Sequence, residues 1–376
     1  ITPGVMGYYP LKDNAVHFFV NQKKNDKSFV VEGVKYFTSL DGNSIDSFPS
    51  KGDYEVEVNC TNAKGSWNYS KWVARINNIT GKVSCNISFT SKTPSGINDY
   101  IKGLSDTEQG IGQVVNENGY RYEGENPNNY IYFNDELWRI IGVFDENSHG
   151  KTGQYLTKII RNDSIGGYAW DKSKKNNWAT SSLYNLLNTN YYNATDGTSG
   201  GNCYQYFTSI TGNCDYTETG LQNEYRNMVE NVTWYLGGKD STSYTAEVFY
   251  TGERDITSVY SGNTASTTGY IGLMYASDYG YSVLSTSCAR TTKLGSYGTS
   301  ACGGSSWLKK ETNEWTVTHR SASSYNSFNL SNSANLHDIN ALYGFAARPV
   351  LYLKFNVQVY AGDGSISKPY QIKLAS

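Results

Sequence analysis

The chain has 376 residues, of which 14% are aromatic and 18% are charged, and its formal net charge at pH 7 is -2. This length excludes a single small domain, and this aromatic content excludes a disordered chain. The balanced charge, with no cluster of lysine and arginine, excludes a general nucleic-acid binder. Apolar runs stay far below the roughly 18 residues of a membrane-spanning helix, so the sequence predicts no membrane span.

Residues 1–92 have the pattern of a β-domain. β-Branched and aromatic residues dominate several runs, and turn-forming Asp-Gly, Pro and Gly residues separate them. We expect strands at 14–21, 27–40, 54–61, 72–79 and 82–90. The sequence therefore predicts an antiparallel, immunoglobulin-like β-sandwich over 1–92, resembling a generic bacterial surface domain, followed by a second domain over 93–376.

The first expected strand has two interpretations. Val16, Phe18 and Val20 alternate on one face, and an irregular Gly- and Pro-containing stretch precedes them. Such a strand can complete the sheet of a neighbouring subunit, and head-to-tail repetition of that contact builds an open filament. The other interpretation pairs the strand within its own domain.

The six cysteines fall into three sequence-local pairs, Cys60 with Cys85, Cys203 with Cys214 and Cys288 with Cys302. No histidine lies near them at metal-ligand spacing, so zinc is disfavoured and three local disulfides are the favoured pattern. Disulfides indicate a secreted or cell-surface protein, whereas free thiols are the cytosolic alternative. The first residue is Ile1 rather than Met, which fits either removal of a signal segment or an arbitrary cut.

Beyond residue 93 the pattern becomes mixed, and the expected fold class is α+β. A hairpin is predicted from 130–133 and 137–144, and short helices from a cap at Ser181 or Ser182 and from the periodic apolar residues of 221–232. The stretch 239–268 has no helical period. Further strands are expected at 155–161, 270–275, 315–318, 350–354, 357–360 and 370–374.

Six segments of this second domain occur in a distinctive order. They are YIYFNDELWRIIGVF at 130–144, LTKIIRNDSIGGYAWD at 156–171, NNWATSSLYNLLN at 176–188, IGLMYASDYGYS at 271–282, WTVTHRS at 315–321 and GFAARPVLYLK at 344–354. The succession resembles the bacterial C-type-lectin-like domains related to retroelement-diversified variable proteins and to formylglycine-generating enzymes. The resemblance covers about residues 98–376 and implies a compact α+β domain that presents long loops to a ligand.

The resemblance also implies a ligand face around the late tryptophan strand and the loop after it. Transferred by position, that face consists of Trp315, Arg320, Tyr325, Asn326, Phe328 and Tyr343. The copper-binding cysteine pair of the formylglycine-generating enzymes is not matched. The calcium-binding tripeptide of sugar-binding lectins is not matched either, because Glu125-Asn126-Pro127-Asn128 is out of pattern. No catalytic residue, cofactor or metal is therefore implied.

Three enzyme patterns fail on their context. Gly197-Thr198-Ser199-Gly200-Gly201 matches a nucleophile elbow but has neither the strand before it nor the helix after it. The pair Gly110 and Gly112 lacks the third glycine of a dinucleotide loop, because that position is Val115. The four histidines are widely separated, and a pair of carboxylates assembled in space is the one catalytic arrangement left open.

The amino-acid composition favours a role in ligand recognition. Tyrosine, serine, glycine and asparagine dominate antibody binding loops, and this chain is rich in all four. The alternative is that a chain short of aliphatic residues needs tyrosine in its core. We interpret the sequence as a non-enzymatic, exported bacterial surface protein that binds a glycan or protein ligand, alone or within an appendage. The alternative is a structural subunit of a filament or pilus that self-associates by N-terminal strand addition.

Overall fold

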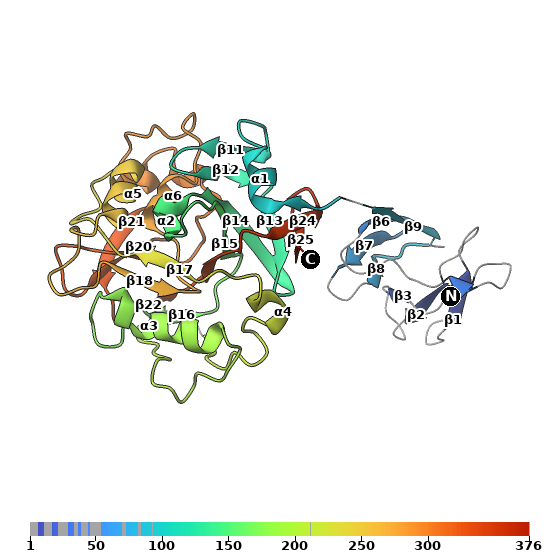
Figure 1. Cartoon of the computed structure of the whole chain (residues 1–376), viewed down its shortest axis with the longest axis horizontal. Helices are drawn as coiled ribbons and strands as arrows, with labels where there is room; N and C mark the ends of the chain where they lie inside the picture. The colour runs from blue at the N-terminus through green and yellow to red at the C-terminus, as the bar shows by residue number, and fades with distance from the viewer. Residues whose placement is uncertain are drawn as a thin grey trace. The chain divides into compact units, whose positions relative to one another are not determined.

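A computed structural model describes residues 54–69, 73–81, 84–91, 93–210 and 212–375, and the backbone of five short strands between 7 and 45. The chain divides into two compact units (Figure 1). The small unit comprises Ile1–Ser95, Val359–Gly362 and Gln371–Lys373; the large unit comprises Gly96–Gln358, Asp363–Tyr370 and Leu374–Ser376. Strands account for 36% and helices for 16%, and nearly all strand pairs are antiparallel, so the protein is rich in β-sheet.

The small unit consists of β-strands. Its five-stranded sheet has the order β1 (Gly7–Pro10), β2 (His17–Asn21), β3 (Phe29–Gly33), β8 (Val73–Asn77) and β7 (Lys64–Asn68). Two further pairs are β4 (Phe37–Thr38) with β5 (Ser44–Ile45) and β6 (Tyr54–Thr61) with β9 (Ser84–Ser91). Ala74 and Ile76 are fully buried and pack against Val58 and Ile87, so residues of β8 share a small core with residues of β6 and β9.

The pairing of β2 bears on the two interpretations of the first expected strand. Phe18 lies opposite residues of both β1 and β3, and so does Val20, whereas Val16 lies outside the described residues. Both hydrogen-bonding edges of β2 are thus occupied by strands of the same chain. This pairing favours the interpretation in which the strand pairs within its own domain, and addition of Phe18 and Val20 to a neighbouring subunit stays a prediction.

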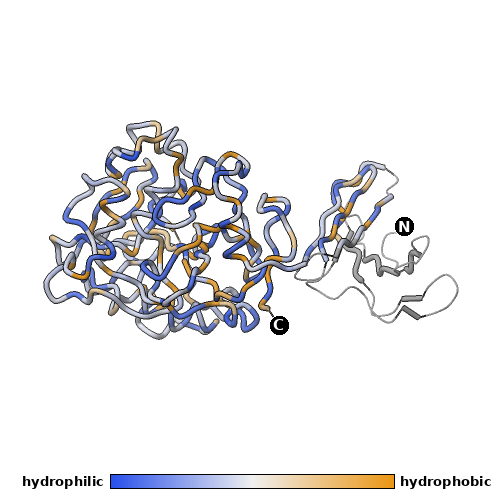
Figure 2. Tube along the Cα trace, turned by 45° about the horizontal axis from the view of Figure 1, so that its top comes forward, coloured by the Kyte–Doolittle hydropathy of each residue, from blue (hydrophilic) through white to orange (hydrophobic). Residues whose placement is uncertain are grey.

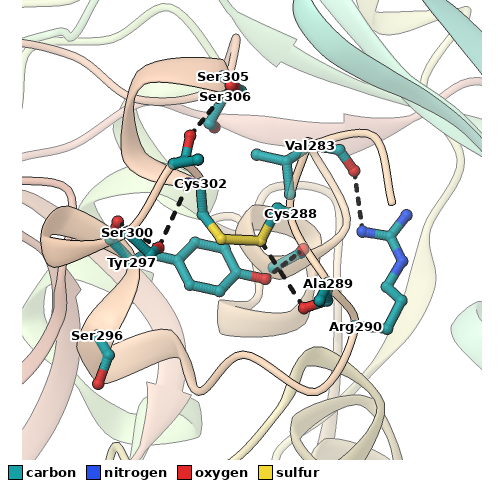
Figure 3. The surroundings of a disulfide bond; sticks show 12 residues. Val283, Cys288, Ala289, Arg290, Ser296, Tyr297, Ser300, Cys302, Ser305 and Ser306 are labelled. Carbon is teal, nitrogen blue, oxygen red and sulfur yellow. Dashed lines mark hydrogen bonds between the residues drawn. A yellow bond between two sulfur atoms is a disulfide. The ribbon is translucent and has the colours of Figure 1, made fainter. Parts of the chain in front are cut away.

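All three disulfides expected from the sequence are present. Cys60 and Cys85 lie directly opposite each other in β6 and β9, with their Cα atoms 4.0 Å apart. The others join Cys203 to Cys214 and Cys288 to Cys302. In Figure 3 the last of these lies beside the ring of Tyr297, whose hydroxyl donates a hydrogen bond to the Gly280 carbonyl at 2.9 Å. Three disulfides are typical of a protein that folds in an oxidising, extracytoplasmic compartment.

The central sheet of the large unit has six strands. They are β11 (Gly110–Asn116), β12 (Tyr120–Pro127), β14 (Glu136–Phe144), β15 (Leu156–Arg161) and β23 (Val350–Tyr352) in this order, with β13 (Tyr130–Phe133) paired to β14. The predicted hairpin is confirmed as β13 and β14. Its turn residues Asn134 and Asp135 have φ of 55° and 60°, left-handed values that asparagine and aspartate tolerate well.

A second sheet of the large unit contains the late tryptophan strand. Its order is β16 (Gly167–Ala169), β22 (Gly344–Ala346), β19 (Glu314–His319), β20 (Asn326–Leu330) and β21 (Leu336–Asn340). A smaller sheet of this unit pairs β17 (Val232–Tyr235) with β18 (Ser266–Gly269). One more three-stranded sheet, whose residues are divided between the two units, has the order β10 (Ser95–Gly96), β24 (Val357–Ala361) and β25 (Gln371–Leu374).

The helices of the large unit are short. They are α1 (Ile97–Lys102), α2 (Glu146–His149), α3 (Ser182–Asn185), α4 (Asn223–Arg226), α5 (Ala246–Arg254) and α6 (Ala276–Gly280), with a π-helical turn at Leu186–Tyr191 and 3-10 turns at Trp178–Thr180, Leu294–Thr299 and Gly303–Ser305. The predicted cap of α3 is confirmed, because the Ser181 side chain accepts a hydrogen bond from the Tyr184 amide. None of the helices in the described part of the chain is long and apolar enough to cross a bilayer.

Three predictions of elements are wrong. The helix expected over 221–232 ends at Arg226, and the β-branched Val232 instead begins β17. No strand forms at 270–275, because the amides of Tyr270 and Ile271 donate to the side-chain oxygen of Asn188 rather than to a neighbouring strand. Helix α5 lies in the stretch for which no helical period was expected, because its buried positions include Gly252 and Glu253, which do not extend an apolar pattern.

The core of the large unit is aromatic. Figure 2 shows that hydrophobic stretches along the chain are short and interspersed with hydrophilic ones. Trp138, Trp170, Trp178, Trp234 and Trp315 are nevertheless all less than 2% exposed. Burial in this unit therefore depends on large rings, as expected for a chain with few aliphatic residues.

Candidate functional site

Two of the predicted ligand residues belong to this core. Trp315 is 1% exposed and donates its indole N–H to the Tyr168 carbonyl, and Phe328 is fully buried against the ring of Phe249. Both strands that carry them, β19 and β20, are buried along almost their whole length. Their prediction as ligand contacts is corrected, because side chains without accessible surface cannot touch a ligand.

Arg320 and Asn326 lie at the ends of the same strands and are engaged within the protein. Both donate to the same carboxylate oxygen of Asp338, at 2.9 and 2.8 Å respectively. Arg320 also donates to the Asp240 carbonyl at 2.7 Å. These contacts join β19, β20 and β21, so the two residues fix the loops above the sheet.

Tyr325 and Tyr343 are the exposed members of the predicted set. Tyr325 is 50% exposed, and Tyr343 is 37% exposed. Tyr343 stacks on Phe207 with ring centroids 5.7 Å apart, and Phe207 is itself 70% exposed. The Tyr343 amide donates to the carbonyl of Asn340 at 3.1 Å, so this aromatic pair adjoins the segment that contains Asn340.

Tyr325 and Asn340 line a surface cavity of about 700 Å³. The cavity lies between loops that are far apart in the sequence, around residues 173–180, 260–263 and 324–325. Its lining residues are Ser173, Lys174, Lys175, Asn177, Thr180, Tyr260, Ser261, Gly262, Asn263, Ser324, Tyr325 and Asn340.

The buried Asn176 links these loops by side-chain hydrogen bonds. Its side chain is 1% exposed, and its Nδ2 lies 3.1, 2.7 and 2.8 Å from the carbonyl oxygens of Arg320, Ser323 and Asn326. Its Oδ1 accepts a hydrogen bond from Asn263 at 2.9 Å. One buried amide therefore connects all three loops, and such a network confers a defined shape on the cavity.

Two further features fix the loop backbones. The Asp171 carboxylate accepts hydrogen bonds from the amides of Ser173 and Lys175 at 3.0 Å each, which closes the turn around Lys174. Lys174 has a left-handed backbone with φ of 60°, and Gly262 has φ of 89°, where a side chain would be strained. The loops are thus held by specific contacts before any ligand arrives.

His319 supports the wall of the cavity. Its Nε2 accepts a hydrogen bond from the Tyr260 amide at 3.3 Å, which requires a neutral ring with the proton on Nδ1. Burial lowers the pKa of His319 to about 4. The imidazole therefore stays neutral at physiological pH and continues to accept this bond.

The low pKa of His319 predicts a pH dependence of stability. Its folded pKa lies below the unfolded value of about 6.5, so its stabilising contribution is complete above that pH and is lost as the pH falls through about 4. We expect this residue to lower the free energy of unfolding by about 3 kcal/mol between pH 7 and pH 4. Urea unfolding at pH 7, 5 and 4 should show a weaker dependence in His319→Gln. The exposed His337→Gln variant should keep the wild-type dependence; equal curves for both variants would contradict the assignment.

The lining offers hydrogen bonds and positive charge. It has hydroxyls from serine, threonine and tyrosine, amides from asparagine and two ammonium groups. Within the described residues, the lining includes no Asp, Glu, His or Cys, and nowhere do three such residues gather where they can hold a metal ion. This arrangement is suited to binding a polar molecule with many hydroxyl groups.

The sequence did not indicate most of this cavity. Lys174, Tyr260 and Asn263 lie in polar loops with no motif, whereas Asn177 and Thr180, like the buried Asn176, stand within one of the quoted segments. Comparison of the chain with models of known protein families, with curated proteins and with solved structures finds no match to any of them. The geometry of the cavity is therefore the main guide to function.

Proposed function

We propose that this is a non-enzymatic, exported surface protein for adhesion or recognition, and that its large unit binds a glycan in the loop cavity. The observation that carries the proposal is a cavity lined by hydroxyl, amide and tyrosine groups and held in shape by the buried Asn176. Its volume of about 700 Å³ falls within the range of small-ligand sites.

The chemistry of the lining supports a sugar as ligand. A sugar presents hydroxyl groups, each a donor and an acceptor, together with flat apolar faces formed by C–H groups. Asparagine and serine side chains match the hydroxyls, and tyrosine supplies both a ring face and a polar tip. Tyr325, which is half exposed, and Tyr260 provide the rings here.

The proposal includes a cellular location and a fold for each unit. The three disulfides support an extracellular or cell-surface location. We propose further that the large unit is a C-type-lectin-like domain and the small unit an immunoglobulin-like sandwich. The support is the order of the segments in the sequence and the location of the cavity in loops around the late strands. Filament assembly through β2 is not proposed, since that strand is paired on both sides.

A binding experiment tests the function. We expect the full chain to bind glycans on a printed array of neutral, carboxylated and sulfated saccharides. Tyr325→Ala should weaken binding at least about 10-fold, because it removes the exposed ring without touching the core. Tyr155→Ala is the matched control, since Tyr155 is 41% exposed and lies outside the cavity lining. Absence of binding to every glycan, or full binding by Tyr325→Ala, would overturn the proposal.

A further inference from the structure

Lys174 and Lys175 are the charged residues of the cavity lining in the described part of the chain. Both side chains are exposed. In the same part of the chain, Lys151 pairs with Glu230 at 2.8 Å and Lys309 with Glu311 at 2.9 Å, whereas Lys239, Lys293 and Lys354 have no ion pair among the described residues. No ion pair of Lys174 or Lys175 is found among the described residues.

The acids on neighbouring segments are already engaged. The Asp171 carboxylate accepts from the amides of Ser173 and Lys175 through one oxygen and from Ser182 at 3.1 Å through the other, and its side chain is buried. Asp338 pairs with Arg320. The two lysines thus add positive charge to the lining of the cavity, although the chain as a whole carries a net charge of -2.

The positions of the two charges are constrained by the backbone. The Asp171 contacts close the loop that carries both lysines, and Lys174 at its centre has a left-handed backbone. A ligand therefore meets two cations on a loop that is already ordered, which reduces the entropy lost on binding.

We infer that the glycan bound in this cavity is acidic, and that Lys174 and Lys175 contact its carboxylate or sulfate group. The inference rests on the proposed glycan-binding function and names the class of its ligand. Tyr325 packs on the sugar ring, while the ammonium groups select for the anion. A neutral sugar leaves this pair of charges without a counterpart, so the acidic form binds more tightly.

The glycan array tests the inference with the wild-type chain and two variants of it. Wild-type protein should bind acidic glycans at least about 10-fold more tightly than their neutral counterparts, and more weakly as NaCl is raised from about 20 to about 200 mM. The double variant Lys174→Gln, Lys175→Gln should lose this preference. Lys293→Gln is the matched control, because it removes one exposed positive charge outside the cavity lining.

The outcomes separate the inference from the function on which it rests. Preference for carboxylated or sulfated spots, lost only in the double variant, supports the inference and identifies the anion. Equal binding of neutral and acidic glycans, or a preference that survives in the double variant, overturns the inference and leaves the glycan-binding function intact. Binding to no glycan overturns both. Retained circular dichroism of the double variant shows that a loss of binding is not a loss of fold.

Discussion

Replacing Asn176 by aspartate is expected to abolish glycan binding and to lower the free energy of unfolding by about 3 kcal/mol. The substitution keeps the shape of the side chain and the oxygen that accepts from Asn263. It removes the Nδ2 donor that faces the carbonyls of Arg320, Ser323 and Asn326. A carboxylate oxygen then faces buried carbonyl oxygens, which repel it.

Binding and stability should change together in this variant, because one side chain connects all the loops of the cavity. Urea unfolding measures the stability, and the glycan array measures the binding. Asn193→Asp is the matched control: Asn193 is exposed and donates to the Thr189 carbonyl at 2.8 Å, so the same chemical change occurs at the surface. If Asn176→Asp unfolds like wild type and binds normally, the network beneath the cavity does not determine its shape.

The features that the sequence predicted correctly are local ones. The Asn134-Asp135 turn between two apolar runs specifies its hairpin, and the Ser181 cap specifies the start of α3. Cys203 and Cys214 are separated by only 11 positions, so spacing alone favoured their pairing. Such signals operate within a few residues and need no knowledge of the tertiary fold.

The candidate site is non-local, and this explains why the sequence located it only in part. Asn176 meets Asn263 across 87 positions and Asn326 across 150 positions. The resemblance pointed to the segment of β19 and β20 and to Tyr325, which lines the cavity, but the two strands are buried on both faces, so their polar residues are as inaccessible as their apolar ones. Trp315 and Val317 share one face of β19, so the strand pattern favoured a core position for Trp315, whereas the transfer by position assigned it to the ligand face.

The tyrosine residues also show that the sequence alone does not reveal which side chains are buried. Composition left open whether the many tyrosines serve the core or a binding surface. The structure buries some tyrosines and exposes others. Tyr122, Tyr191 and Tyr275 are almost fully buried, whereas Tyr206 and Tyr325 are 40% and 50% exposed. Burial depends on the packing of distant segments, so residue type alone did not decide between the two roles.

The largest loss of stability is expected from Asp278→Ala. Asp278 is fully buried, lies 3.0 Å from Nη1 of Arg121 through one oxygen and pairs with the ammonium group of Lys158 through the other. Burial alone raises the pKa of Asp278, but Lys158 and Arg121 together hold it below its usual value, so the carboxylate is ionised at neutral pH. Its oxygen also accepts from the Tyr275 amide at the start of α6.

Removing this carboxylate leaves two buried cations without a partner, which costs about 3–5 kcal/mol. Asp99→Ala is the matched control, since Asp99 pairs with Lys102 at 2.9 Å but its side chain is 86% exposed, and an exposed pair contributes about 0–1 kcal/mol. Urea unfolding at pH 7 should therefore separate the two variants by several kcal/mol. Equal losses would mean that the two buried charges are relieved when Asp278 is removed, either by water that reaches Arg121 and Lys158 or by loss of a proton from Lys158, whose pKa burial already lowers to about 8.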